Sequence, residues 1–123
     1  MRSPVINQVN TIFVHVSDLE KSVEWYCKLL GKKFDPNQVK KPVFNISLNE
    51  YTGITLDAGQ VETKKFTPLP YALFNLHTND INESFKFAKE SNFKIAQEII
   101  DFGDLAFFNL YDPDKNIIMI CTG

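Results

Sequence analysis

The feature that most constrains this chain is an internal repeat. The segment Phe13–Trp25, FVHVSDLEKSVEW, is followed half a chain later by a similar segment, Asn75–Phe87, NLHTNDINESFKF. Three polar residues recur at a constant separation of 62 positions (77 − 15): His15 as His77, Asp18 as Asp80 and Ser22 as Ser84. This separation is half of the 123-residue length. Two copies are too few for a solenoid, which needs three or more repeats, so the pattern predicts two half-domains of one design within a single domain.

The first copy reads as a strand followed by a helix. Hydrophobic residues alternate along Asn10–Val16, which indicates a strand. Ser17 is followed three residues later by Glu20, the spacing of a capping box at a helix start. One apolar stripe then recurs at helical spacing: Leu19, Val23, Tyr26 and Leu30. Gly31 stands where a left-handed residue ends many helices, so we expect the helix to stop there.

The second copy follows the same order. Tyr71–His77 is the expected strand, and Asp80 with Glu83 has the capping-box spacing. The apolar stripe of the second helix consists of Ile81, Phe85 and Ala88. Asn92 takes the place of glycine after this helix, because asparagine tolerates the left-handed conformation. The second half therefore predicts the same strand-to-helix corner.

Three further strands are expected after each helix. In the first half they are Lys33–Asp35, Val43–Leu48 and Ile54–Ala58; in the second they are Lys94–Ile100, Leu105–Leu110 and Asn116–Thr122. The last two are joined by a turn at Asp112–Lys115, where proline presets a turn dihedral and the aspartates can bond their own backbone. The units span about residues 5–58 and 71–122, and the polar segment 59–70, which contains two prolines, is the expected linker.

These elements predict an α+β fold of two pseudo-symmetric βαβββ units. Each unit would cover one face of a mixed sheet with its helix and turn the other face toward its twin. The two sheets would then pair around a central cleft. Such a cleft is the natural place for a small ligand.

Composition and charge exclude several classes of partner. The net charge is −2 and the longest runs of basic residues are pairs such as Lys40-Lys41, whereas a nucleic-acid partner requires a clustered basic face. No apolar run approaches the roughly 18 residues of a membrane span, and the N-terminus lacks the apolar core of a signal peptide. With only two cysteines, Cys27 and Cys121, we expect no disulfide framework and a cytoplasmic location.

Two motifs resemble the vicinal oxygen chelate superfamily: VSDLEKSVEWYCKLLG at positions 16–31 and YDPDKNIIMI at positions 111–120. That superfamily includes glyoxalase I, extradiol dioxygenases, fosfomycin resistance enzymes and bleomycin resistance proteins. The resemblance covers essentially the whole chain, and its motifs are specific for the fold rather than for one reaction. It implies a ligand site between two units and, because members often dimerise, a homodimer.

In metal-dependent members a divalent ion is held by the first and last strands of each unit, so the resemblance implies four positions here. The first-strand positions, seven residues before the helix-capping aspartates, hold Thr11 and Leu73. The last-strand positions hold Met119 and, 62 residues earlier, Asp57. Leu73 offers no donor atom, and Met119 offers a thioether that suits copper(I) rather than a hard divalent ion. We therefore expect neither a metal nor another cofactor.

The two histidines follow these positions on the same strand faces. If the units are related by a pseudo-two-fold axis, antiparallel strands carry His15 and His77 apart, so a shared metal is not expected. Two interpretations of each histidine remain open. It steadies the strand-to-helix corner through its neighbouring aspartate, or it contacts a ligand or acts as an acid or base near neutral pH.

Other side chains are candidates for lining the cleft. Asp57 is either an exposed strand-end residue or the single charged group in an apolar cleft, where it would select a cationic or hydroxylated ligand or act as a general base. Phe13 is the expected aromatic contact, while the choice between Phe107 and Phe108 is left open by strand alternation. Cys121 lies on a strand without a partnering histidine, so a nucleophilic thiol is not expected.

These observations favour a metal-free small-molecule binding protein of the glyoxalase and bleomycin resistance type. The expected ligand-binding residues are Thr11, Phe13, His15, Asp57, Leu73, Asn75, His77 and Met119. The alternative is a glyoxalase- or dioxygenase-like enzyme with a non-standard site, in which Asp57 or a histidine is the acid or base. The residues do not specify the identity of the ligand.

Overall fold

The computed structural model describes residues 1–59 and 67–123, and the chain divides into two compact units, Met1–Lys64 and Lys65–Gly123. The expected linker 59–70 lies mostly outside the described residues, and its last part, 67–70, has no regular secondary structure. Each unit has its own α-helix and its own sheet. Within the described residues, no helix has both the length and the apolar character needed to cross a membrane.

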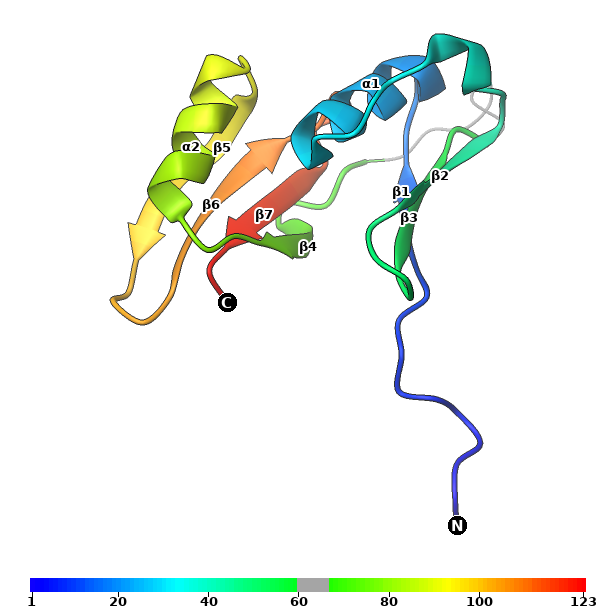
Figure 1. The fold of residues 1–123 in the computed structure, drawn as a ribbon, viewed down its shortest axis with the longest axis horizontal. Helices are drawn as coiled ribbons and strands as arrows, with labels where there is room; N and C mark the ends of the chain where they lie inside the picture. Colours follow the sequence, from blue (N-terminus) through cyan, green and yellow to red (C-terminus); the bar gives the residue numbers. More distant parts are fainter. Residues whose placement is uncertain (60–66) are drawn as a thin grey trace. The chain divides into compact units, whose positions relative to one another are not determined.

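The first unit combines one α-helix with a sheet of three strands (Figure 1). Its elements in chain order are β1 (Thr11–His15), α1 (Leu19–Leu30), the short 3₁₀-helix η1 (Pro36–Gln38), β2 (Val43–Ser47) and β3 (Gly53–Asp57). The strand order is β1-β3-β2, with β3 parallel to β1 and antiparallel to β2. Helix α1 packs against β2 and β3. The sheet is therefore mixed, as expected.

Helix α1 begins at an aspartate rather than at the expected serine. Asp18 is the N-cap, and its carboxylate accepts a hydrogen bond from the backbone amide of Lys21 at 3.1 Å. The predicted Ser17–Glu20 capping box is therefore wrong by one residue, because Asp18 already holds the extended cap position from which a side chain reaches the first turn. Gly31 ends the helix in the left-handed region with φ 67°, as expected.

The strand expected at Lys33–Asp35 is not formed. Asp35 instead caps η1, where its carboxylate accepts the backbone amide of Asn37 at 3.0 Å and Pro36 is the first residue. Proline suits a first helical position, and an aspartate that bonds its local backbone competes with strand pairing. The first unit is therefore βαββ rather than βαβββ.

One face of the first sheet carries the core of its unit. The buried strand and helix side chains are Val14, Ile46, Ile54, Leu56, Leu19, Val23 and Tyr26. Because successive residues of a strand point to opposite faces, the strand residues that alternate with these buried ones share the other face. We call this second surface the helix-free face of the unit. It carries the candidate functional residues.

The second unit has the complete predicted βαβββ order (Figure 1). Its elements are β4 (Ala72–His77), α2 (Ile81–Glu90), β5 (Lys94–Asp101), β6 (Ala106–Tyr111) and β7 (Ile117–Cys121). The strand order is β4-β7-β6-β5, in which only the β4–β7 pair is parallel. Helix α2 packs against β5, β6 and β7. The expected α+β class with two mixed sheets is confirmed.

Local signals place the ends of these elements. The Asp80 carboxylate accepts the backbone amide of Glu83 at 3.0 Å, which confirms the second cap. Asn92 follows α2 with φ 62°, the left-handed conformation that was expected of it. In the turn before β7, the Asp112 carboxylate accepts the backbone amide of Asn116 at 2.8 Å. This aspartate therefore bonds its own turn, as its sequence predicts.

The structure also settles the choice between the two adjacent phenylalanines of β6. Phe108 is 1% exposed, and its ring meets that of Phe85 on α2 edge to face at 5.2 Å. Phe108 is therefore on the helix-covered face of the second sheet. Strand alternation places Phe107 on the helix-free face of that unit.

Candidate functional site

The helix-free face of the first unit gathers four of the expected ligand-binding residues. Strand register sets its residues in three rows across β1, β3 and β2: His15, Asp57 and Val43; Phe13, Thr55 and Asn45; Thr11, Gly53 and Ser47. Thr11, Phe13, His15 and Asp57 therefore share one face. The Phe13 ring is 64% exposed, so it offers an apolar surface within the middle row.

The register nevertheless separates Thr11 from Asp57. Thr11 pairs with Gly53, and Asp57 lies four residues further along that strand. At about 3.3 Å per residue this gap is about 13 Å. Ligands of one metal ion lie within about 2 Å of it, so these two short side chains do not serve one ion.

His15 and Asp57 are direct neighbours across the parallel strands β1 and β3. Both belong to the helix-free face, where His15 is exposed and Asp57 is half-buried. A carboxylate beside an imidazole can orient the ring and stabilise its protonated form, which is what general acid–base catalysis requires. His15 and Asp57, which were predicted as separate candidates, thus form one candidate acid–base pair.

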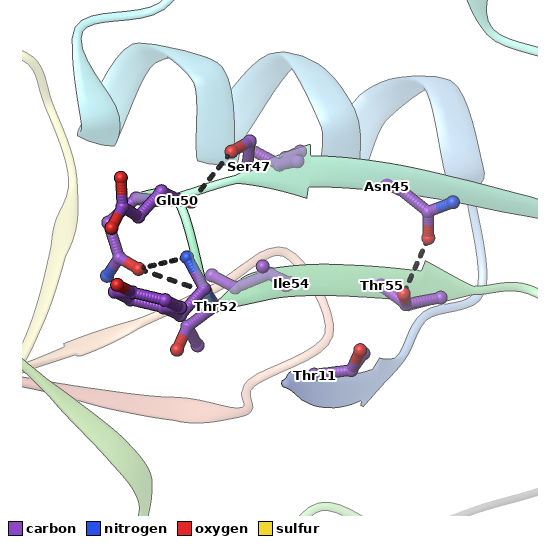
Figure 2. A pocket seen from close by; sticks show the side chains of 11 residues that line it. Thr11, Asn45, Ser47, Glu50, Thr52, Ile54 and Thr55 are labelled. Atoms are coloured by element: carbon purple, nitrogen blue, oxygen red, sulfur yellow. Dashed lines mark hydrogen bonds between the residues drawn. The ribbon is translucent and has the colours of Figure 1, made fainter. Parts of the chain in front are cut away.

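A recess of about 320 Å³ opens around the hairpin between β2 and β3 (Figure 2). Its polar lining residues are Thr11, Asn45, Ser47, Asn49, Glu50, Tyr51, Thr52 and Thr55. Gly53 also lines it, and a Cβ atom added there would lie 2.9 Å from the carbonyl oxygen of Ile46. No side chain fits at Gly53 without a shift of the neighbouring backbone. The recess is therefore lined mainly by hydroxyl and amide groups.

Hydrogen bonds hold the walls of this recess in place. The Thr55 hydroxyl donates to Asn45 Oδ1 at 2.6 Å, which links β3 to β2 (Figure 2). Asn49 Oδ1 accepts the backbone amide of Tyr51 at 2.8 Å and so shapes the hairpin loop. A hydrogen bond to Glu50 raises the pKa of the Tyr51 hydroxyl, with a smaller contribution from desolvation. Tyr51 is therefore a hydrogen-bond donor throughout the neutral range.

The helix-free face of the second unit forms three rows across β4, β7, β6 and β5. They are His77, Cys121, Phe107 and Ile100; Asn75, Met119, Asn109 and Gln97; Ala72, Ile117, Tyr111 and Lys94. Asn75, His77 and Met119, which were expected to bind a ligand, thus lie in two adjacent rows. Leu73 stands apart from them. It falls at a bulge where the register shifts between Ala72 and Phe74, so it has no partner on β7.

His77 and Cys121 are neighbours in this register. Cys121 therefore has a histidine beside it on the adjacent strand, contrary to expectation. The His77 ring bonds Asn79 Oδ1 at 2.9 Å, so its contact with the corner is made through Asn79 rather than through Asp80. The Cys121 thiol is buried, and its sulfur accepts the backbone amide of Gly123 at 3.3 Å. An exposed nucleophile is not formed.

The pairing also changes which residues correspond in the two units. Phe13 lies opposite Thr55, and its counterpart Asn75 lies opposite Met119. Met119 therefore corresponds to Thr55, at a separation of 64 (119 − 55), and not to Asp57. The second unit has two more residues between its first and last strands, which is why the constant separation of 62 fails there.

The fold and these two faces define the class of protein. The sequence profile of the Glyoxalase/Bleomycin resistance protein/Dioxygenase superfamily matches residues 6–120. The chain belongs to this superfamily, and the resemblance drawn from its two motifs is confirmed.

Solved structures of low sequence identity share the fold. One is a glyoxalase/bleomycin resistance protein/dioxygenase from Alicyclobacillus acidocaldarius, with 18% identity over 98% of this chain and 93% of that chain and a TM-score of 0.65. A member of the same superfamily from Sphaerobacter thermophilus DSM 20745 has 21% identity, coverages of 94% and 97%, and a TM-score of 0.68. Oxidase ChaP-H1 has 19% identity, coverages of 96% and 97%, and a TM-score of 0.71. No protein of curated function matches the chain.

The donor set does not fit the divalent metal that metal-dependent members hold. Thr11, Leu73 and Met119 supply no carboxylate or imidazole, and Asp57 lies beside His15 rather than beside Thr11. In residues 1–59 and 67–123, no three His, Cys, Asp or Glu side chains are grouped so that they could hold an ion. The superfamily's usual metal chemistry therefore has no supporting set of residues among these positions.

Sequence reasoning missed the polar residues of the recess and of the second unit. On β2 and β3, Asn45, Ser47 and Thr55 occupy the positions that alternate with buried Ile46 and Ile54. That alternation was visible and could have identified them. Asn109 and Gln97 had no such signal, because the face of the Leu105–Leu110 segment could not be assigned from its two adjacent phenylalanines.

Proposed function

We propose that this chain is a small-molecule binding protein that works without a divalent metal ion. The observation that carries the proposal is the polar recess of the first unit, which adjoins the exposed ring of Phe13 on the same sheet face. Superfamily membership supports a ligand-binding role for such a face. The residues at the expected metal positions support binding by hydrogen bonds and apolar contact instead of by coordination.

The chemistry of the lining indicates the kind of ligand. A volume of about 320 Å³ is at the lower end of the roughly 300–1,000 Å³ typical of small-molecule sites. Hydroxyl and amide groups offer both donors and acceptors, and Glu50 is the one carboxylate in the lining. We therefore infer a small polar ligand with an apolar edge that rests on Phe13.

A thermal-shift screen of polar metabolites and antibiotics, carried out in EDTA, tests this function. A ligand that binds only the folded protein raises the melting temperature, and the chelator removes any contribution from metal. Thr55→Val keeps the side-chain shape but removes the hydroxyl of the recess, so it should reduce the shift given by any hit. Thr67→Val, an exposed substitution outside the recess, is the matched control.

Two outcomes of this screen would contradict the proposal. Compounds that stabilise the protein only when EDTA is omitted and zinc or manganese is added would show that binding requires a metal. Hits that are unaffected by Thr55→Val and by Phe13→Ala would move the binding site away from this face.

A second function, metal-independent proton transfer, is favoured by the pairing of His15 with Asp57. In this reading the histidine exchanges a proton with the ligand, and the neighbouring carboxylate orients the ring. His15→Gln and Asp57→Asn should then abolish turnover of a screened hit while leaving its affinity nearly unchanged. If both variants change affinity without affecting any reaction, the pair contributes to binding alone.

A further inference from the structure

The helix-free face of the second unit contains a buried amide oxygen without a hydrogen bond. Oδ1 of Asn109, in the middle of β6, is inaccessible to solvent and has no partner among the described residues. Leaving a buried polar atom unsatisfied typically costs about 1–3 kcal/mol, which is why such atoms are rare in folded proteins. The Asn109 oxygen therefore needs an explanation.

Neighbouring buried polar groups of the same unit are satisfied. Asp112 and Asn116 are each 4% exposed. The Asn116 amide nitrogen donates to Asp112 Oδ2 at 2.9 Å, and its backbone amide donates to Oδ1 at 2.8 Å. The second unit thus provides a hydrogen-bond partner for a buried side-chain amide only seven residues along the chain from Asn109 (116 − 109). The unsatisfied oxygen is a local property of the Asn109 position.

Asn109 occupies the centre of a neutral polar row. Strand register places Asn75 and Met119 on one side of it and Gln97 on the other. The Gln97 amide nitrogen donates to the backbone carbonyl of its neighbour Glu98 at 3.2 Å, so it is directed to its own strand. No residue of this row carries a charge. The row therefore suits a neutral ligand better than an ion.

Aromatic side chains flank this position along β6. Phe107 and Tyr111 lie two residues before and after Asn109, so all three share the helix-free face. Phe107 is half-buried and stacks on Phe102 with ring centroids 6.2 Å apart. An amide between two rings provides hydrogen bonds to the edge of a flat molecule and apolar contact to its body.

We propose that Asn109 is a binding residue for a planar neutral ligand that carries an amide-type edge, such as a lactam, an aromatic carboxamide or a comparable heterocycle. The Asn109 side chain offers an acceptor and donors side by side, and the complementary group is therefore another amide, which offers the same pair in reverse. The ligand's N–H supplies the bond that Asn109 Oδ1 lacks. This inference rests on the proposed small-molecule function and adds a binding residue on the second unit.

The direct test uses small probes and ¹⁵N-labelled full-length protein. Benzamide and 2-pyridone present an amide edge on a flat ring, whereas benzoate and pyridine have similar shapes without it. We expect the two amides, and not their controls, to shift the side-chain amide resonances of Asn109. Asn109→Leu should weaken amide binding at least tenfold, which corresponds to about 1.4 kcal/mol. Asn82→Leu, an exposed substitution on α2, should leave it unchanged.

Stability of the ligand-free protein provides a second, independent readout. If Asn109 Oδ1 is unsatisfied, Asn109→Leu removes that cost and should raise the melting temperature by about 3 °C or more. A lower melting temperature would show that the amide is satisfied within the protein, and it would overturn the inference. Equal binding of benzamide and benzoate, or unchanged amide binding in Asn109→Leu, would overturn it as well.

These outcomes are separable from failure of the proposed function. Amide probes that still bind to Asn109→Leu but not to Thr55→Val would preserve a small-molecule site in the first unit and eliminate Asn109 as a binding residue. If neither the amide probes nor any compound of the wider screen binds, both proposals fail together.

Discussion

Ser22 and Ser84 are equivalent residues of the two helices, but among the described residues only the Ser84 hydroxyl has a hydrogen-bond partner. The Ser84 hydroxyl lies 2.6 Å from the hydroxyl of Thr78. The residue 62 positions before Thr78 is Val16, which has a methyl group where threonine has its hydroxyl. The Ser22 hydroxyl is consequently buried without a hydrogen bond among the described residues.

This difference predicts opposite effects of the same substitution. Ser84→Ala should lower the free energy of unfolding by about 1 kcal/mol, because it removes a hydrogen bond. Ser22→Ala should leave the free energy of unfolding unchanged or raise it. Denaturant titration measures both, and Val16→Thr serves as the control because it should make Ser22→Ala destabilising. Equal losses in the two alanine variants would contradict the assignment.

Cys27 gives a prediction on pH. Burial raises the pKa of the Cys27 thiol, and the nearby Lys32 ammonium offsets part of this effect. When folding raises the pKa of a thiol, the protonated thiol contributes to the free energy of unfolding, and this contribution is fully present at pH values below the unfolded-state pKa. It is lost as the pH rises through the folded-state pKa. A thiol reagent should therefore modify Cys27 slowly at mildly alkaline pH and rapidly after unfolding. Fast modification of Cys27 in the folded protein would contradict its burial.

At the scale of single elements, the caps can be tested in parallel. Asp18→Ala and Asp80→Ala should each lower the free energy of unfolding by about 1 kcal/mol, because each removes a side-chain acceptor for a first-turn amide. Glu24→Ala, an exposed substitution in the middle of α1, is the control. If Asp18→Ala has no more effect than Glu24→Ala, Asp18 is not the cap of α1.

The elements also show which signals a sequence carries. All seven strands of the structure begin and end within one residue of their expected bounds, because alternation and turn signals are local. The strand predicted at Lys33–Asp35 is wrong because this three-residue segment contains only one apolar residue, Phe34, and ends at the Asp35-Pro36 cap of η1. Strand register is non-local, so neither the bulge at Leu73 nor the pairing of His15 with Asp57 could be predicted.

The same limit applies to the candidate site. Thr11 and Phe13 were predicted to share a face because that inference needs only alternation within one strand, whereas Asp57 was placed with them through the superfamily resemblance. Their separation along the face depends on the offset between β1 and β3, which no local pattern encodes. Asn109 could not be identified as a candidate for the same reason, since its importance comes from its neighbours on β7 and β5.

At the scale of the whole molecule, we propose that the chain forms a homodimer, as members of the superfamily often do. Light scattering coupled to size-exclusion chromatography should give twice the chain mass of 14.1 kDa. The measured mass should remain constant on dilution through the micromolar range. A mass of 14.1 kDa at all concentrations would exclude the dimer.

The most direct test of metal-independent binding is the metal content of protein purified without chelators. Thr11, Leu73 and Met119 replace the donors that a divalent ion needs, so elemental analysis should find far less than one equivalent of any divalent metal per chain. About one equivalent of zinc, nickel, manganese or iron in the unmodified protein would contradict metal-independent binding.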